Sequence, residues 1–328
     1  MEELIAAFPS NIGQAYNSTK TVSFKIKTNE IINVVLLGMG GSGIGAKIVS
    51  KWVQDEIKVP VLLSQDYDIP AFIGKNTLVI ACSYSGNTEE TVISAEKAFQ
   101  AGATVVGLCS GGKIKQFCTT NKLDCVLVPG GNPPRTTTAF SIVHILNILN
   151  KFELISQSVL NKVLACEEFL NNHVEEIKNN ATEIADFLYN HTAIIYSSVA
   201  YESIVLRARQ QLNENSKELC IGNVIPEMNH NELVGWTGGN NNHAALFLDP
   251  QDLNDRNVKR FEVTIEEAKR WTKQVMVVKA KGDNMVQRSM FLMHLIDWTS
   301  LYLANLKNVD AVDIRAIDYL KNELEKLA

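Results

Sequence analysis

The chain has 328 residues, 46% of them hydrophobic and 20% charged, which is the composition of a soluble globular protein with room for two domains. Its net charge of −5 offers no basic surface, and its apolar runs fall short of the roughly 18 residues of a membrane-spanning helix, so neither nucleic acid nor a membrane is an expected partner. Six cysteines without a C-x-x-C pair, and an acidic N-terminus without a signal-peptide pattern, favour a reducing, cytoplasmic location.

The first half of the sequence alternates between apolar strands and amphipathic helices. Helical spacing is visible between most of the strands, for example at 45–53 and 89–100. Strands that are apolar throughout are buried on both faces, which is typical of a parallel sheet covered by helices. Five such strands predict a doubly wound α/β unit. They lie at residues 33–37, 59–63, 77–82, 104–108 and 124–128.

Residues 139–190 are predicted to be helical. They contain an apolar helix at 140–149 and a long, charged helix at 157–188, which we interpret as a connector between domains. A second alternating series follows. Its strands are predicted at 193–198, 243–250 and 274–282, and its helices around Arg207 and Arg209, at 285–306 and from 314 to the end. The fold class is therefore α/β, with two doubly wound parallel-sheet domains at residues 1–155 and 156–328.

The first strand ends in GMGGSGIG, residues 38–45. Gly38, Gly40 and Gly43 fit the dinucleotide pattern G-x-G-x-x-G, and Asp66 lies near the position of the acid which that pattern requires. However, Ser42 sits among closely spaced glycines. Such a loop exposes backbone N–H groups at a helix N-terminus, where an anion is favoured.

The third strand leads into ACSYSGNTEETV, residues 81–92. If the strand order is 2-1-3-4-5, this loop faces the first one across the crevice where ligands bind in such sheets. Hydroxyl groups from both loops would then converge on a phosphate, with no fixed cation: those of Ser42, Ser83, Ser85 and Thr88. The alternative is that Ser85, Asn87 and Thr88 only cap the next helix, with Glu90 completing a capping box.

GMGGSGIG followed by SYSGNTEET resembles a sugar isomerase (SIS) domain, the phosphosugar-binding module. PPRTTTAF (133–140) and IPEMNHNELVGW (225–236) resemble the bifunctional phosphoglucose/phosphomannose isomerases of bacteria and archaea. The resemblance implies two SIS domains per chain, each a flavodoxin-like three-layer sandwich. It also implies a homodimer with a shared active site near the subunit boundary, and a phosphate cradle formed by Gly41, Ser42, Ser83, Ser85 and Thr88.

This resemblance implies the interconversion of glucose 6-phosphate, and of mannose 6-phosphate, with fructose 6-phosphate through a cis-enediol, without metal or cofactor. That chemistry needs a base over the C1–C2 edge, a charge for the enediolate and a group that opens the ring. By resemblance Glu227 is the base and Arg135 stabilises the enediolate. From the sequence alone, Glu227 could instead be a surface carboxylate at a helix start, and Arg135 a phosphate or carboxylate clamp.

The ring-opening roles fall, by resemblance, on His243 from the neighbouring subunit and on Lys321 in the last helix. Among the other histidines, His144 and His294 lie in apolar helices and are expected in the core, whereas His173 and His191 lie on or near the connector. His230 could orient Glu227 or act as a cap. The three threonines 136–138 are expected to cap the next helix, and the turn SSVAYES (197–203), which lacks glycine, is not expected to be a second phosphate cradle.

Three other functions are compatible with parts of this pattern. A non-catalytic sugar-phosphate regulator would keep the serines and Thr88 without needing Glu227. A dinucleotide-dependent oxidoreductase would use the glycine motif and Asp66. An amidotransferase-type aminosugar isomerase would share the fold, but the chain has no N-terminal cysteine for a glutaminase. No metal site is expected, because the histidines and cysteines lack ligand spacing.

Overall fold

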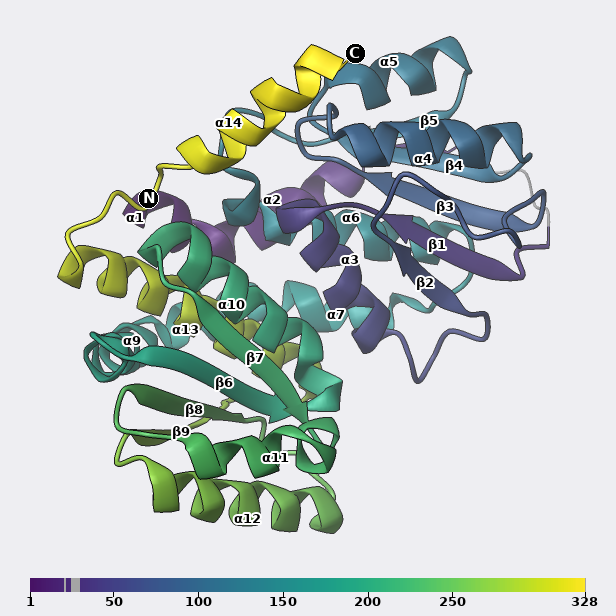
Figure 1. The fold of residues 1–328 in the computed structure, drawn as a ribbon. Helices are drawn as coiled ribbons and strands as arrows, with labels where there is room; N and C mark the ends of the chain where they lie inside the picture. Colours follow the sequence, from purple (N-terminus) through teal and green to yellow (C-terminus); the bar gives the residue numbers. More distant parts are fainter. Residues whose placement is uncertain (21, 25–29, 328) are drawn as a thin grey trace. The chain divides into compact units, whose positions relative to one another are not determined.

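The computed structural model describes residues 1–20, 22–24 and 30–327, which divide into two compact units (Figure 1). The first unit comprises Ala6–His173 with Gly282–Met290, and the second comprises Met1–Ile5, Val174–Lys281 and the segment from Phe291 onward. Each unit is an α/β fold around its own parallel sheet. Within the described part of the chain, no helix is long and apolar enough to cross a membrane.

The sheet of the first unit is parallel, and its order β2-β1-β3-β4-β5 is the one assumed in placing the two polar loops face to face. Its central strand β3 is buried along its whole length, because helices cover both faces. The strand β2 begins at Val61 and not at residue 59, since Pro60 has no N–H to donate to a ladder and only its carbonyl accepts, from Val34 N. The strands are β1 Asn33–Leu37, β2 Val61–Ser64, β3 Thr77–Cys82, β4 Thr104–Cys109 and β5 Asp124–Leu127.

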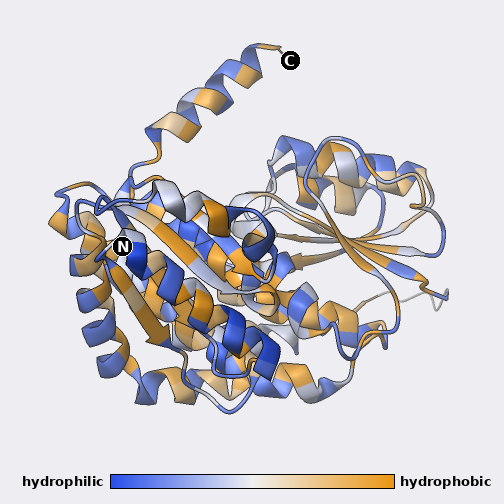
Figure 2. Cartoon of the chain, turned by 60° about the horizontal axis from the view of Figure 1, so that its bottom comes forward, coloured by the Kyte–Doolittle hydropathy of each residue, from blue (hydrophilic) through white to orange (hydrophobic). Residues whose placement is uncertain are grey.

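Alternate residues of these strands pack on opposite faces of the sheet. Val35, Val79 and Val105 form one core with the helices α4 (Glu89–Gln100) and α5 (Gly112–Thr120). On the opposite side, α3 (Gly40–Trp52) contacts β1 and also packs on α6 (Thr138–Lys151), which in turn contacts α2 (Phe8–Thr19). The result is a three-layer sandwich whose strands are coloured mainly as hydrophobic in Figure 2.

The predicted connector helix at 157–188 is wrong in one respect, because it is three helices: α7 (Gln157–Leu164), α8 (Cys166–Asn172) and α9 (Val174–Leu188). At the second break, the His173 amide donates to the carbonyl of Leu170, three residues back. The ring Nδ1–H of His173 donates to the carbonyl of Phe169 at 2.8 Å. The α-helical ladder therefore ends at the point where the chain passes from the first unit to the second.

The sheet of the second unit is also parallel, in the order β7-β6-β8-β9. The strand β7 was not predicted, because its run CIGNVI contains Gly222 and Asn223 and lacks a clear strand pattern, and the helix α12 (Asp255–Trp271) was not predicted either. The strands are β6 Thr192–Ser198, β7 Cys220–Ile225, β8 His243–Asp249 and β9 Val275–Lys279. The remaining helices are α1 Glu2–Ala6, α10 Glu202–Ser216, α11 Glu232–Gly235, α12 Asp255–Trp271, α13 Met285–Leu306 and α14 Arg315–Leu324.

A buried polar ladder joins α10 to α13 within the second unit. Arg207 Nη2 lies 2.7 Å from Asp297 Oδ2, and Gln211 Nε2 donates to the other carboxylate oxygen at 2.7 Å. One to two turns further along, Asn215 Nδ2 donates to Ser300 Oγ at 2.9 Å. Because these groups are almost completely buried, each requires its partner, so the ladder fixes the register of the two helices.

His144 provides a test of the packing in the first unit. The side chain is completely buried on α6, with Nε2 3.1 Å from Ser18 Oγ on α2, and burial lowers the pKa of its imidazole from near 6.5 to about 4. Below pH 6.5 the unfolded chain therefore takes up a proton on His144 that the folded protein does not. We expect the free energy of unfolding to fall between pH 7 and pH 4.5, by about 2 kcal/mol more in the native protein than in His144→Leu. Urea unfolding at the two pH values measures the free energy of unfolding of both proteins. An equal fall in the native protein and in His144→Leu would contradict the prediction.

Candidate active site

The loop after β1 provides backbone N–H groups at the start of α3. Met39 precedes the helix in an extended conformation and supplies no side-chain cap. Its carbonyl accepts from the amides of Ser42 and Gly43, so the amides of Gly40 and Gly41 are the ones that another acceptor can use. A Cβ on Gly43 would collide with the carbonyl of Gly38, and a Cβ on Gly41 would lie 2.9 Å from the Arg135 amide nitrogen. The glycines therefore let this loop approach the segment after β5, and they bring Gly41, Ser42 and the backbone of Arg135 together.

One hydrogen bond connects the loops after β1 and β3. The Tyr84 amide donates to Ser42 Oγ at 2.9 Å, because adjacent parallel strands deliver both loops to the same edge of the sheet. A hydroxyl that accepts in this way still has its own hydrogen to donate. The two loops thus face each other as the sequence analysis predicted.

Tyr84 also holds the loops after β4 and β5. Its carbonyl accepts from the amide of Ser110 at 2.8 Å and from Ser110 Oγ at 2.7 Å. Its phenolic oxygen accepts from the amide of Asn132 at 3.1 Å. A single residue therefore ties four loops at the carboxyl edge of the sheet, a role for which the sequence offered no separate signal.

The hydroxyls of the β3 loop do not cap α4, so the capping interpretation is wrong. Thr88 is the N-cap residue, but its side chain makes no capping bond. Ser83 is completely buried and donates to Thr88 Oγ1 at 2.9 Å, while the Thr88 amide donates back to Ser83 Oγ at 3.3 Å. Ser85 is exposed and accepts only a local bond, from the Asn87 amide at 3.2 Å.

The turn that carries Arg135 is held by the threonines that follow it. Thr136, Thr137 and Thr138 donate their hydroxyls to the carbonyls three residues earlier, at 2.8, 3.0 and 3.3 Å. They therefore stabilise the turn η1 (Pro134–Thr136), and the prediction that they cap α6 is wrong. Arg135 itself is 3% exposed.

Glu227 follows β7, at the carboxyl edge of the sheet in the second unit. It begins the short turn η3 (Glu227–His230), in which Met228 is fully buried in the core. The side chain of Asn229 fixes the turn to α12, with Nδ2 2.8 Å from Thr264 Oγ1. Glu227 is exposed, and its Oε1 accepts from Asn231 Nδ2 at 3.0 Å. The side chain that bonds Glu227 is thus Asn231, whereas His230 was the neighbour considered from the sequence.

His243 lies at the opposite edge of this sheet from Glu227. It pairs with Thr192 at the start of β6, whereas Ile225, two residues before Glu227, pairs with Ser198 at the end of β6. The length of β6 between these positions is about 20 Å. The ring Nδ1 accepts from the Asn240 amide at 3.3 Å, which leaves the hydrogen on Nε2. Within one chain, therefore, Glu227 and His243 are not brought together.

Lys321 lies on α14, which ends near the C-terminus in Figure 2 and carries both hydrophobic and hydrophilic residues. Its side chain is 64% exposed, and Nζ lies 3.9 Å from Asp318 Oδ1. No contact that the described residues make joins it to Glu227 or His243.

His144 and His294 are buried in the core, as predicted, and burial lowers the pKa of His294 to about 3.

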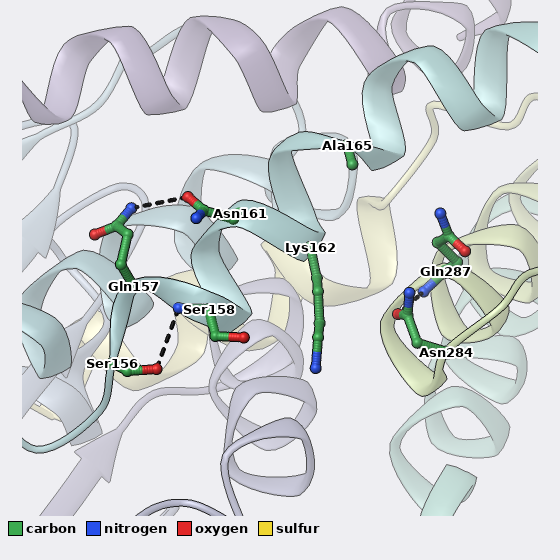
Figure 3. Close-up of a pocket in the computed structure, with 8 residues that line it drawn as sticks. All are labelled: Ser156, Gln157, Ser158, Asn161, Lys162, Ala165, Asn284 and Gln287. Carbon is green, nitrogen blue, oxygen red and sulfur yellow. Dashed lines mark hydrogen bonds between the residues drawn. The ribbon is translucent and has the colours of Figure 1, made fainter.

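The large hollow shown in Figure 3 lies elsewhere in the first unit, between α7 and the start of α13. It has a volume of about 610 Å³, and several of the polar groups that line it serve helix ends. Ser156 caps α7, and Asn284 Oδ1 accepts from the amides of Val286 and Gln287.

The space beneath the loops after β1 and β3 is small. It has a volume of about 20 Å³, room for a water molecule, so a ligand would lie on these loops and not beneath them. Among the described residues no group of three His, Cys, Asp or Glu side chains is placed to bind a metal.

Two parallel-sheet units, with polar loops at the strand ends, define an SIS-type α/β protein. Residues 177–324 match the family description "Bacterial phospho-glucose isomerase C-terminal SIS domain". Among solved structures, the C-terminal domain of glucosamine-fructose-6-phosphate aminotransferase from Francisella tularensis superimposes with a TM-score of 0.78 at 12% identity, covering 95% of this chain and 97% of that one. At this identity the likeness shows the fold alone.

Relatives that match nearly the whole length of the chain identify the family more specifically than the fold does. The bifunctional phosphoglucose/phosphomannose isomerase of Caldicellulosiruptor bescii is 34% identical, over 100% of this chain and 99% of the relative. The protein of the same name from Thermoplasma acidophilum is 35% identical over 91% of each. The chain belongs to the bifunctional phosphoglucose/phosphomannose isomerase family, as its motifs predicted.

Gly86 tests how tightly the loops must pack. It has φ +73° and a Cβ would collide with the carbonyl of Gly111, whereas Gly131 has φ +93° and nothing within 4 Å of a Cβ. Both positions share the backbone strain of a left-handed residue, and only Gly86 adds the collision. We expect Gly131→Ala to lower the free energy of unfolding by about 1 kcal/mol and Gly86→Ala by about 3 kcal/mol. Chemical denaturation measures both, and similar losses would show that the loops can separate without cost.

Proposed function

We propose that this protein is a metal-free aldose–ketose isomerase that interconverts glucose 6-phosphate and mannose 6-phosphate with fructose 6-phosphate in the cytoplasm. The observation that carries the proposal is membership of the bifunctional family over the full length of the chain. The position of Glu227 at a strand's carboxyl edge supports it, because ligands bind at that edge in parallel sheets.

In this proposal the substrate phosphate binds the loops after β1 and β3. Gly41 provides a backbone amide at the start of α3, and the hydroxyls of Ser42, Ser85 and Thr88 donate to phosphate oxygens. Ser83, which is buried, acts by holding Thr88 in place. The dipole of α3 favours the dianion, so no lysine or arginine is needed in the cradle.

Glu227 then moves a proton between C2 and C1. Its carboxylate takes the proton from C2 of the open aldose, and the electron pair forms the C1–C2 double bond as the C1 oxygen becomes the enediolate. The proton of the C2 hydroxyl passes to the C1 oxygen, and the same carboxyl group returns its proton to C1 as the C2 carbonyl forms, which gives the ketose. Arg135 offsets the negative charge of the enediolate. Rotation about C2–C3 before the reverse step would allow both C2 epimers to share one enediol.

His243 and Lys321 are proposed to open the pyranose ring, with His243 supplied by a second subunit. The geometry of the sheet supports this arrangement, because a chain cannot bring its own His243 to its own Glu227 across about 20 Å of β6. A homodimer with two shared sites satisfies it, since each site then takes Glu227 from one chain and His243 from the other.

Substitution of the base tests the mechanism. Glu227→Gln keeps the size of the side chain but removes the proton acceptor, so we expect kcat for glucose 6-phosphate to fall at least about 10³-fold with KM within a few-fold of the native value. The coupled assay with fructose 6-phosphate as the product measures this. Near-normal turnover would remove Glu227 from the mechanism. Tight sugar-phosphate binding by a native protein without turnover would instead indicate a regulator.

Mixed dimers test the shared site. Glu227→Gln and His243→Asn are each expected to be nearly inactive, and Asn retains an acceptor for the Asn240 amide. If the two residues act from different subunits, random mixing of the two variants restores one intact site in each mixed dimer, or about a quarter of native activity. Unfolding and refolding the two variants together, followed by assay, measures the recovery. No recovery, with mixed dimers shown to have formed, would mean that His243 of a second subunit does not complete the site of Glu227, and it would overturn the shared-site proposal.

A further inference from the structure

Asn231 links the side chain of Glu227 to the backbone of α11. Its Nδ2 donates to Glu227 Oε1 at 3.0 Å, and its Oδ1 accepts from the Glu232 amide at 2.6 Å as the N-cap of that helix. The orientation of this amide is determined by its partners, because a backbone N–H can only donate and must face the oxygen. The NH₂ group is therefore the part that faces the carboxylate of Glu227.

The support behind Asn231 is rigid. Glu232 Oε1 accepts from Tyr196 Oη at 2.5 Å, and Glu232 Oε2 accepts from Asn223 Nδ2 at 2.6 Å, so strands β6 and β7 both hold its carboxylate. Trp236 Nε1 donates to the same tyrosine oxygen at 3.2 Å. Tyr196 is completely buried, and its burial, together with the neighbouring Glu232, raises the pKa of its phenol, so it stays a donor at physiological pH.

The other flank of Glu227 is equally well fixed. Met228 is fully buried next to Trp236, Ile225 and Phe261 in one apolar cluster. Asn229 is bound to Thr264, which is itself buried on α12. The backbone of Glu227 is therefore held from both sides, while its side chain is exposed and long enough to adopt several rotamers.

We propose that Asn231 is the positioning residue of Glu227: it selects the rotamer in which Oε1 is held by the amide and Oε2 is turned towards the reacting carbons. The inference rests on the proposed function, because it takes Glu227 as the base. A carboxylate that must deliver and return one proton gains from such preorganisation, and a hydrogen bond to a charged group is among the stronger ones. In the motif PEMNHNELVGW, Asn231 thereby positions Glu227, and Glu232 and Trp236 support Asn231.

Two substitutions separate positioning from helix capping. Asn231→Asp keeps the size and the capping oxygen but replaces the donor by an anion near Glu227. Asn231→Ser also keeps a capping acceptor, without adding charge, but is too short to reach Glu227. We expect both variants to retain the native Tm within a few degrees. We expect kcat to fall about 10-fold for Asn231→Ser and up to about 100-fold for Asn231→Asp, with KM for glucose 6-phosphate within about 2-fold.

The kinetic isotope effect gives a readout that a purely structural role would not change. With glucose 6-phosphate deuterated at C2, both variants are expected to show a larger effect on kcat than the native enzyme, because misplacing the base slows the proton transfer itself. The matched control is Asn179→Asp, which adds the same charge on the exposed side of α9 and is expected to leave kcat and the isotope effect unchanged.

The outcomes distinguish the two proposals. If Asn231→Ser and Asn231→Asp keep kcat within 2-fold while Glu227→Gln is inactive, Asn231 is only a cap and the isomerase mechanism stands. If Glu227→Gln keeps its turnover, the proposed base is wrong and the inference is overturned with it. If Asn231→Asp does not fold, Asn231→Ser decides, and a native isotope effect in that variant contradicts positioning.

Discussion

The hydrogen bond from the Tyr84 amide to Ser42 Oγ is the interaction on which the first unit's site depends. Adjacent parallel strands carry β1 and β3 to the same edge of the sheet, and this bond holds their loops face to face. The carbonyl and the phenol of Tyr84 then attach the loops after β4 and β5. Close approach of these backbones requires glycine at positions 41 and 86. Of the glycines that fit the dinucleotide pattern, Gly38 and Gly43 likewise leave no room for a Cβ and so serve the packing of this loop.

The same geometry of parallel strands separates Glu227 from His243 in the second unit. Glu227 follows the end of β7, and His243 stands at the start of β8, so the sheet lies between them. Catalysis by both residues then requires two chains, and a dimer becomes part of the proposed chemistry and not only a means of stability. The contacts of Asn231 and Glu232 explain why the polar motif after β7 is long: it holds one exposed carboxylate with side chains anchored in the sheet.

The sequence predicted the elements that have a regular apolar spacing and the polar loops that follow the strands. The five strands of the first sheet and the buried β3 followed from apolar runs, and the facing loops followed once the strand order 2-1-3-4-5 was assumed. The strand β7 was missed because Gly222 and Asn223 interrupt its pattern, and the connector was drawn as one helix because amphipathic spacing persists across its breaks. Tyr84 was missed because its hydrogen bonds are tertiary and leave no local pattern. Asn231 was missed although it bonds Glu227 and Glu232 locally, because only His230 was considered as a partner of Glu227. The domain boundary near residue 155 and the site residues stay predictions.

The measurement that tests the account most directly is a coupled assay of the purified, chelator-treated protein on fructose 6-phosphate, with glucose 6-phosphate and mannose 6-phosphate followed separately. The account predicts that both products form without added metal, because one carboxylate and one shared enediol suffice for both epimers. Formation of glucose 6-phosphate alone would remove the mannose activity. Absence of both products, or activity that returns only when a metal is added, would contradict the central claim.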